Sequence, residues 1–179
     1  MAQEAGLVRE QWVADADRAE FEAAYVATWQ RVYRYAWVLT RHREDAEDVA
    51  SETYQRAYAA WSAGRRPKAE VLPWLLLIAR RVVIDRRRRS RLLGWLPLTA
   101  VSDVDRADEQ SLDRAEIWLW FADLCRVLPD RQREAFLLRY QFDLSDEAIG
   151  KILGVSPGGV RSLLSRALAT LRRQPEMLT

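Results

Sequence analysis

Residues 145–168 read SDEAIGKILGVSPGGVRSLLSRAL, and this stretch decides the fold. Ser145 can cap a helix whose first turn carries two carboxylates, which face the positive end of the helix dipole. Gly154 then ends that helix, because glycine adopts the left-handed conformation without a steric penalty. Ser156 and Pro157 open a second helix as its N-cap and first-turn proline. The stretch therefore predicts a helix-turn-helix, with its apolar side chains in the angle between the helices.

The second helix of this motif has small and cationic side chains on its outward face. Counting about 100° per residue from Val160 places Leu164, Ala167 and Leu171 on the buried side. Arginine can pair with guanine edges in the major groove and serine with phosphates. A solvated polar face is the alternative, but the preceding turn and the basic charge of residues 131–179 favour DNA. The residues predicted to contact DNA are Ser156, Gly158, Arg161, Ser162, Ser165 and Arg166.

Helical periodicity extends through most of the chain, and no run alternates in the two-residue pattern of a strand. Apolar side chains step by three and four over residues 21–39 and again over residues 46–61. A third helix is predicted to start near Pro73 and to run into the arginines at 86–89. The pattern predicts an all-α fold of two small helical domains joined by a flexible acidic linker. Their expected bounds are residues 1–91, 92–111 for the linker, and 112–179.

The net charge is only +2, but charge is sorted along the chain. Residues 1–64 carry −4, residues 65–91 carry +8, residues 92–130 carry −5 and residues 131–179 carry +3. Two basic blocks between acidic ones indicate two surfaces for a polyanion and a different partner for the acidic stretches. Such dense cations repel one another unless phosphates compensate them. The first basic block contains Arg65, Arg66 and Lys68 in a loop, followed by Arg80, Arg81, Arg86, Arg87, Arg88, Arg89 and Arg91.

The second predicted helix has an acidic outer face instead. Asp48, Glu52 and Gln55 lie opposite its apolar stripe, with Asp45 and Ser51 beside them. Carboxylates do not attract DNA. A solvated face and a protein-docking surface are equally compatible with this spacing.

Composition excludes several function classes. One cysteine (Cys125) and one histidine (His42) cannot form a disulfide framework, a cysteine/histidine zinc cluster or a histidine-centred triad. The longest apolar run, residues 71–79, is shorter than the roughly 20 residues of a membrane span. The N-terminus lacks a signal-peptide pattern. We therefore expect a cytoplasmic protein that is soluble, has no catalytic residue, metal or cofactor, and does not insert stably into membranes.

Four groups of residues resemble the sigma-70 type bacterial sigma factors, specifically their short two-domain extracytoplasmic-function group. They occur in the family's order and cover nearly the whole chain. They are DAEDV at 45–49 with ETY at 52–54; WL at 74–75 with IAR at 78–80 and Asp85; LP at 128–129 with QRE at 132–134; and LGVSPG at 153–158.

The resemblance implies a role and partners for each surface. The second helix, with Asp45, Asp48, Ser51, Glu52 and Gln55, would dock on the clamp of core RNA polymerase. The cations Arg65, Arg66, Lys68, Arg80, Arg81, Arg86 and Arg87 would hold the melted minus-ten element, and the loop among them would capture a flipped base. The helix-turn-helix would read the duplex minus-thirty-five element. The resemblance further implies an anti-sigma partner, a monomer when free, and a place with polymerase on the nucleoid.

Three positions depart from the family pattern. Arg81 stands where asparagine is common, Ser51 where glutamine is common, and Gly159 where threonine or a similar residue is usual. The paired glycines at 158 and 159 would cost the recognition helix about 1 kcal/mol.

Two other functions fit parts of the pattern. A conventional helix-turn-helix regulator would bind duplex DNA as a dimer, but the sequence shows neither an effector pocket nor a dimer helix. A peripheral membrane protein could use residues 82–98, where arginines mix with leucines and Trp95. Gly94 and Pro97 interrupt that amphipathic pattern, so it is ranked lower.

Overall fold

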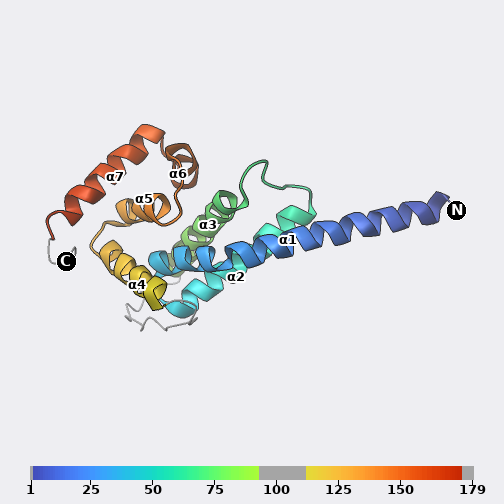
Figure 1. The fold of residues 1–179 in the computed structure, drawn as a ribbon, viewed down its shortest axis with the longest axis horizontal. Coiled ribbons are helices and arrows are strands. Elements are labelled where there is room, and N and C mark those ends of the chain that lie inside the picture. Colours follow the sequence, from blue (N-terminus) through green and yellow to red (C-terminus); the bar gives the residue numbers. More distant parts are fainter. Residues whose placement is uncertain (1, 93–111, 175–179) are drawn as a thin grey trace.

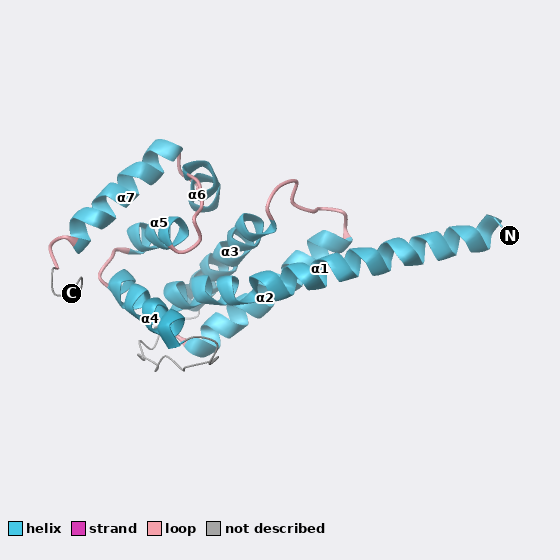
Figure 2. Cartoon of the chain, viewed as in Figure 1, coloured by secondary structure: helices cyan, strands magenta, loops and turns pink. Residues whose placement is uncertain are grey.

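The computed structural model describes residues 2–92 and 112–174, with side chains described over 17–90 and 117–174. These two stretches contain seven helices and no strand (Figure 2), which confirms the predicted all-α fold. The predicted linker lies outside the described residues from residue 93 onward. The helices are α1 (Ala2–Thr40), α2 (Arg43–Ser62), α3 (Val71–Leu92), α4 (Leu112–Arg126), α5 (Asp130–Tyr140), α6 (Asp146–Leu153) and α7 (Pro157–Leu171).

Helices α1, α2 and α3 pack against one another through the predicted apolar stripes. Val32, Val49 and Leu75 are almost fully buried where the three helices meet. The N-terminal half of α1 projects beyond this bundle (Figure 1), so the helix is longer than the stripe at 21–39 that predicted it. Helix α3 begins at Val71, which places Pro73 in its first turn, where the missing N–H breaks no helical hydrogen bond.

Two aromatic residues of the predicted stripes are more exposed than expected. Tyr25 is 39% exposed and Tyr58 is 46% exposed. Each covers a buried ring from the side: Tyr58 lies 5.1 Å from Phe21 and Tyr25 lies 4.7 Å from Tyr54, measured between ring centroids. An aromatic ring can therefore contribute apolar contact from the edge of the bundle while its hydroxyl stays in water.

Helices α5, α6 and α7 pack around a second core that contains Leu137, Ile149 and Val160. Helix α4 packs on α5, and the buried Arg133 secures the turn between them. Its guanidinium donates hydrogen bonds to the carbonyl oxygens of Cys125 at 2.8 Å and Leu128 at 2.7 Å. Both carbonyl oxygens lie at or just beyond the C-terminal end of α4, where few backbone N–H groups are available to them.

The two groups of helices are in contact. Helix α6 packs on α3, and α5 packs on α1 (Figure 1). The rings of Trp37 and Trp118 also meet across this boundary, at 6.3 Å between centroids. Among the described residues, no helix combines the length and the apolar character needed to cross a membrane.

Candidate nucleic-acid interface

The helix-turn-helix forms as its capping residues predict. Ser145 Oγ accepts a hydrogen bond from the Ala148 N–H at 3.2 Å, and Ser156 Oγ accepts one from the Gly159 N–H at 3.1 Å. Gly154 ends α6 with a φ of 68°, in the left-handed region. Each of these three residues thus stabilises the helix end that its chemistry predicts.

Gly150 also shapes the turn, and the sequence analysis did not single it out. A Cβ atom at this position would lie 2.7 Å from the carbonyl oxygen of Val155. Only glycine therefore lets the turn fold back onto α6 at this distance. A larger residue at position 159 would also be crowded, because a Cβ atom there would lie 3.3 Å from Val155 Cβ. The signal for Gly150 in the sequence was a glycine inside an otherwise regular helical pattern.

The outward face of α7 carries the predicted side chains. Val160, Leu164, Ala167 and Leu171 are buried, as the periodicity predicts, and Leu163 is buried as well. The predicted DNA-contacting residues Ser156, Gly158, Arg161, Ser162, Ser165 and Arg166 are all exposed. The face is therefore free of apolar bulk at these positions, which permits close approach to a groove.

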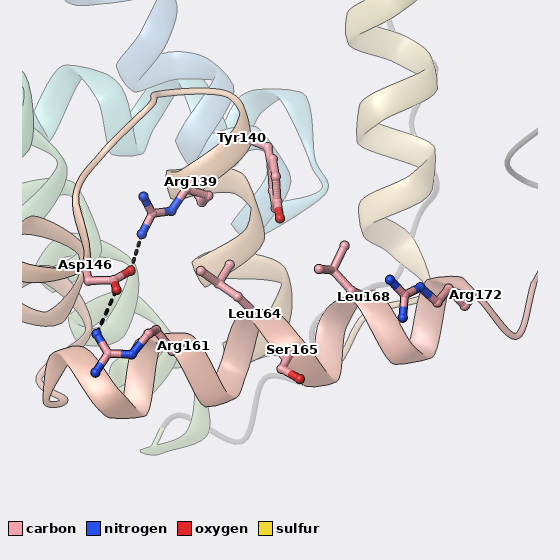
Figure 3. A pocket seen from close by; sticks show the side chains of 8 residues that line it. All are labelled: Arg139, Tyr140, Asp146, Arg161, Leu164, Ser165, Leu168 and Arg172. Atoms are coloured by element: carbon pink, nitrogen blue, oxygen red, sulfur yellow. Dashed lines mark hydrogen bonds and ion pairs between the residues drawn. The ribbon is translucent and has the colours of Figure 1, made fainter.

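An aspartate of α6 orients Arg161 (Figure 3). Asp146 accepts a hydrogen bond from Arg161 Nη1 at 3.1 Å and also pairs with Arg139 of α5. Asp146 thereby links α5, α6 and α7 through two arginines. The three residues border a hollow of about 400 Å³ that Tyr140, Leu164, Ser165, Leu168 and Arg172 also line.

The loop between α2 and α3 presents two of its three cations to solvent. Arg65 and Lys68 are exposed. Arg66 instead lies against α1, where it pairs with Asp17 and with Glu20, and its guanidinium sits 5.2 Å from the centre of the Trp61 ring. Gly64, with a φ of 72°, starts this loop.

The basic face of α3 is partly occupied by other side chains. Arg81 is exposed, and so are Arg88 and Arg89. Arg80 donates a hydrogen bond to Glu134 of α5 at 2.9 Å. Arg87 donates one to the Leu39 carbonyl oxygen at 2.6 Å and lies 3.5 Å from the Asp130 carboxylate.

Arg86 lies with the acidic face of α2 and not with the other cations. It pairs with Asp48 at 3.0 Å and with Glu52 at 3.1 Å, and Arg56 pairs with the other oxygen of Glu52 at 2.6 Å and with Asp85 at 2.9 Å. Glu52 has both carboxylate oxygens engaged in this network. The accessible part of the acidic face consists of Asp45, Asp48, Ser51 and Gln55, all of them exposed.

Burial is the main cause of the pKa shifts of Glu134, Tyr54 and Cys125. Burial raises the pKa of the Glu134 carboxyl, and the bonds from Tyr35 and Arg80 offset only part of this effect. Burial also raises the pKa of Tyr54 to about 12 and that of the Cys125 thiol to about 12. Among the described residues, no three histidine, cysteine or carboxylate side chains gather in a way that could hold a metal ion.

Comparison with known proteins gives a consistent result for both groups of helices. Residues 25–92 match the family model for sigma-70 region 2, and residues 119–171 match that for sigma-70, region 4. The chain is 35% identical over 170 residues to the RNA polymerase sigma-E factor of Streptomyces avermitilis, covering 92% of this chain and 89% of the relative. It is 30% identical over 149 residues to the ECF RNA polymerase sigma factor SigM of Bacillus subtilis, covering 79% of this chain and 86% of that one.

A solved structure shares the fold. The sigma factor RpoE of Bartonella quintana, crystallised with the anti-sigma factor NepR, superposes with a TM-score of 0.70 over 89% of this chain and 96% of that chain, at 24% identity. The fold, the two family models and the identity to relatives that are covered over most of their length agree. The chain therefore belongs to the sigma-70 family of RNA polymerase sigma factors, in the extracytoplasmic-function group.

Proposed function

We propose that this chain is a transcription initiation factor that binds core RNA polymerase and directs it to promoters. It would contribute binding free energy to promoter recognition and strand opening, while polymerase performs the chemistry. The observation that carries the proposal is the capped helix-turn-helix whose outward face, on α7, exposes Arg161, Arg166 and small polar residues. Such a helix is built to enter a major groove.

Each surface has a proposed partner. Helix α7 reads the duplex minus-thirty-five element. The exposed cations Arg65, Lys68 and Arg81, together with Arg80 and Arg87, hold the melted minus-ten strand. The acidic face of α2, with Asp48 at its centre, docks on the polymerase clamp. Arg86 of α3 supports this docking proposal, because its ion pairs with Asp48 and Glu52 fix the positions of both carboxylates.

The proposed domains are residues 1–91, which correspond to region 2, and 112–179, which correspond to region 4. Residues 92–111 would connect them as an acidic linker that threads polymerase channels otherwise occupied by nucleic acid. We further propose that the chain acts in the cytoplasm with polymerase on the nucleoid, is monomeric when free, and is held inactive by an anti-sigma protein. The structure of RpoE from Bartonella quintana, solved with the anti-sigma factor NepR, supports the last point.

Run-off transcription tests the proposal directly. Purified core polymerase and a genomic fragment library should give promoter-dependent products only when the chain is added. Arg161→Ala and Arg166→Ala should reduce these products, because each removes a cation from the outward face of α7. Arg131→Ala, which removes an exposed arginine from α5, is the matched control and should leave them unchanged. Absence of any product, with an active control sigma factor, would contradict the proposal.

A dimeric DNA-binding regulator is distinguished by a second measurement. Light scattering coupled to size exclusion should report one chain per particle. A dimer that protects a palindromic site without polymerase would favour the regulator instead.

A further inference from the structure

The carboxylate of Asp146 holds two arginines that come from different helices (Figure 3). Asp146 is the first residue of α6, and its side chain is only 16% exposed. One oxygen, Oδ1, pairs with Arg139 of α5, and the other, Oδ2, accepts a hydrogen bond from Arg161 Nη1 at 3.1 Å. Because α5, α6 and α7 pack around a common core, the position of this carboxylate is fixed relative to α7.

Arg161 is oriented by a carboxylate of another helix, whereas Arg166, the second arginine on the outward face of α7, bonds within its own helix. The guanidinium of Arg161 lies beside the first turn of α7, where a Cβ atom on Gly158 would be 3.8 Å from its Nη2. Arg166 donates a hydrogen bond from Nε to the Ser162 carbonyl oxygen at 3.2 Å. The side chain of Arg161 is 67% exposed, so most of its surface is available to a ligand. It lies in the N-terminal part of the helix, which is the part of a recognition helix that contacts base edges.

We infer that Asp146 is a specificity-determining residue of the DNA-reading surface, which orients Arg161 for a guanine in the major groove and disfavours its use on phosphates. This inference rests on the proposed role of α7 in reading duplex DNA. Asp146 acts through Arg161 and needs no contact with DNA, so it is a positioning residue.

The hydrogen bond from Arg161 to Asp146 favours guanine by fixing the guanidinium before DNA arrives. Arginine reads guanine with two hydrogen bonds, to O6 and N7, and this geometry suits a guanidinium that is already oriented. A free arginine side chain loses much rotamer freedom when it is immobilised, and the contact with Asp146 removes part of that freedom in advance. Arginine has five N–H donors, and the contact uses one of them, so donors remain for the base.

The charge of Asp146 acts against phosphates. A carboxylate next to the DNA-reading face repels the backbone of every duplex, whatever its sequence. It also neutralises part of the charge by which Arg161 would attract a phosphate. Asp146 therefore lowers general affinity for DNA and raises discrimination between base pairs, which is the way that unfavourable contacts commonly produce specificity.

Asp146→Asn in the full-length chain tests this inference, because asparagine keeps the size of the side chain and removes its charge. Glu147→Gln is the matched control, since it removes the neighbouring carboxylate at an exposed position of the same helical turn. Arg161→Ala identifies the base pair that Arg161 reads. Each chain is combined with core polymerase, and the holoenzyme selects duplexes from a library with a random segment. Competition with duplexes that differ from the selected sequence at single base pairs then measures the discrimination at every position.

The wild-type holoenzyme should prefer guanine at one position by about fivefold or more, and Arg161→Ala should remove that preference. Asp146→Asn should bring the preference at the same position below about twofold and leave the other positions unchanged. Adding Asp146→Asn to Arg161→Ala should cause no further loss, because Asp146 acts through Arg161. Glu147→Gln should keep the preference. Both carboxylate variants should bind random duplex more tightly than the wild-type chain.

A guanine preference that survives in a folded Asp146→Asn chain would overturn the inference. An equal loss of preference in Glu147→Gln would also overturn it, because the effect would then belong to the charge of α6 in general. If circular dichroism shows that Asp146→Asn does not fold, Asp146→Ser replaces it with the same expected result, since serine suits a helix start and cannot form an ion pair. A wild-type holoenzyme that enriches no sequence would contradict the proposed function itself, whereas the other outcomes arise only when it enriches one.

Discussion

Gly150→Ala should destabilise the helix-turn-helix, although alanine favours a helix more than glycine does. The new methyl group would lie 2.7 Å from the Val155 carbonyl oxygen, which is backbone and cannot rotate away. The turn would have to move, and with it the hydrogen bond from the Val155 N–H to the Gly150 carbonyl oxygen at 3.0 Å. Overpacking of this kind costs about 1–3 kcal/mol, against a helix-propensity gain of about 1 kcal/mol. The net loss is therefore up to about 2 kcal/mol.

Thermal unfolding followed by circular dichroism measures this loss. For a chain of this size, a loss of about 2 kcal/mol lowers Tm by roughly 4–8 °C. Gly158→Ala is the matched control, because its methyl group would meet its nearest neighbour, Arg161 Nη2, only at 3.8 Å. That variant should be neutral or slightly stabilising. Equal Tm values for the two variants would refute the steric argument for Gly150.

Three further predictions concern other parts of the structure. Ser156→Ala removes the N-cap of α7 and should cost about 1 kcal/mol in thermal unfolding; no change in Tm would show that the cap is not needed. Because burial raises the pKa of the Cys125 thiol to about 12, it should stay protonated and resist iodoacetamide at pH 8 until denaturant is added; rapid labelling of the native chain would contradict this. Asp48→Arg should abolish binding to core polymerase with the fold intact, whereas Glu22→Arg on α1 should bind normally, and equal affinities would refute the docking face.

Local signals in the sequence were sufficient for the helix-turn-helix. Ser145, Gly154 and Ser156 act within one turn of their own position, so their chemistry alone predicts the caps that the structure shows. The buried side of α7 follows from periodicity for the same reason. Gly150 was missed because the constraint on it comes from the path of the chain after the helix ends.

Contacts between distant helices could not be read from local patterns. Tyr35 and Glu134 are 99 positions apart, and nothing in either segment indicates that the other covers it. Arg86 belongs to a run of arginines by sequence, yet the rotation of α3 turns it toward the carboxylates of α2. Charge sorting along the chain therefore predicts which kinds of surface exist, but packing decides which cations remain available to a partner.

Permanganate footprinting of promoter DNA tests the central claim most directly, because the reagent modifies thymines only where the strands are separated. With core polymerase and this chain together, thymines of the minus-ten element should become reactive, and neither protein alone should have this effect. An Asp48→Arg chain should fail because it cannot reach polymerase. Promoter DNA that stays unreactive with the complete mixture, while a control sigma factor opens its own promoter, would contradict the account.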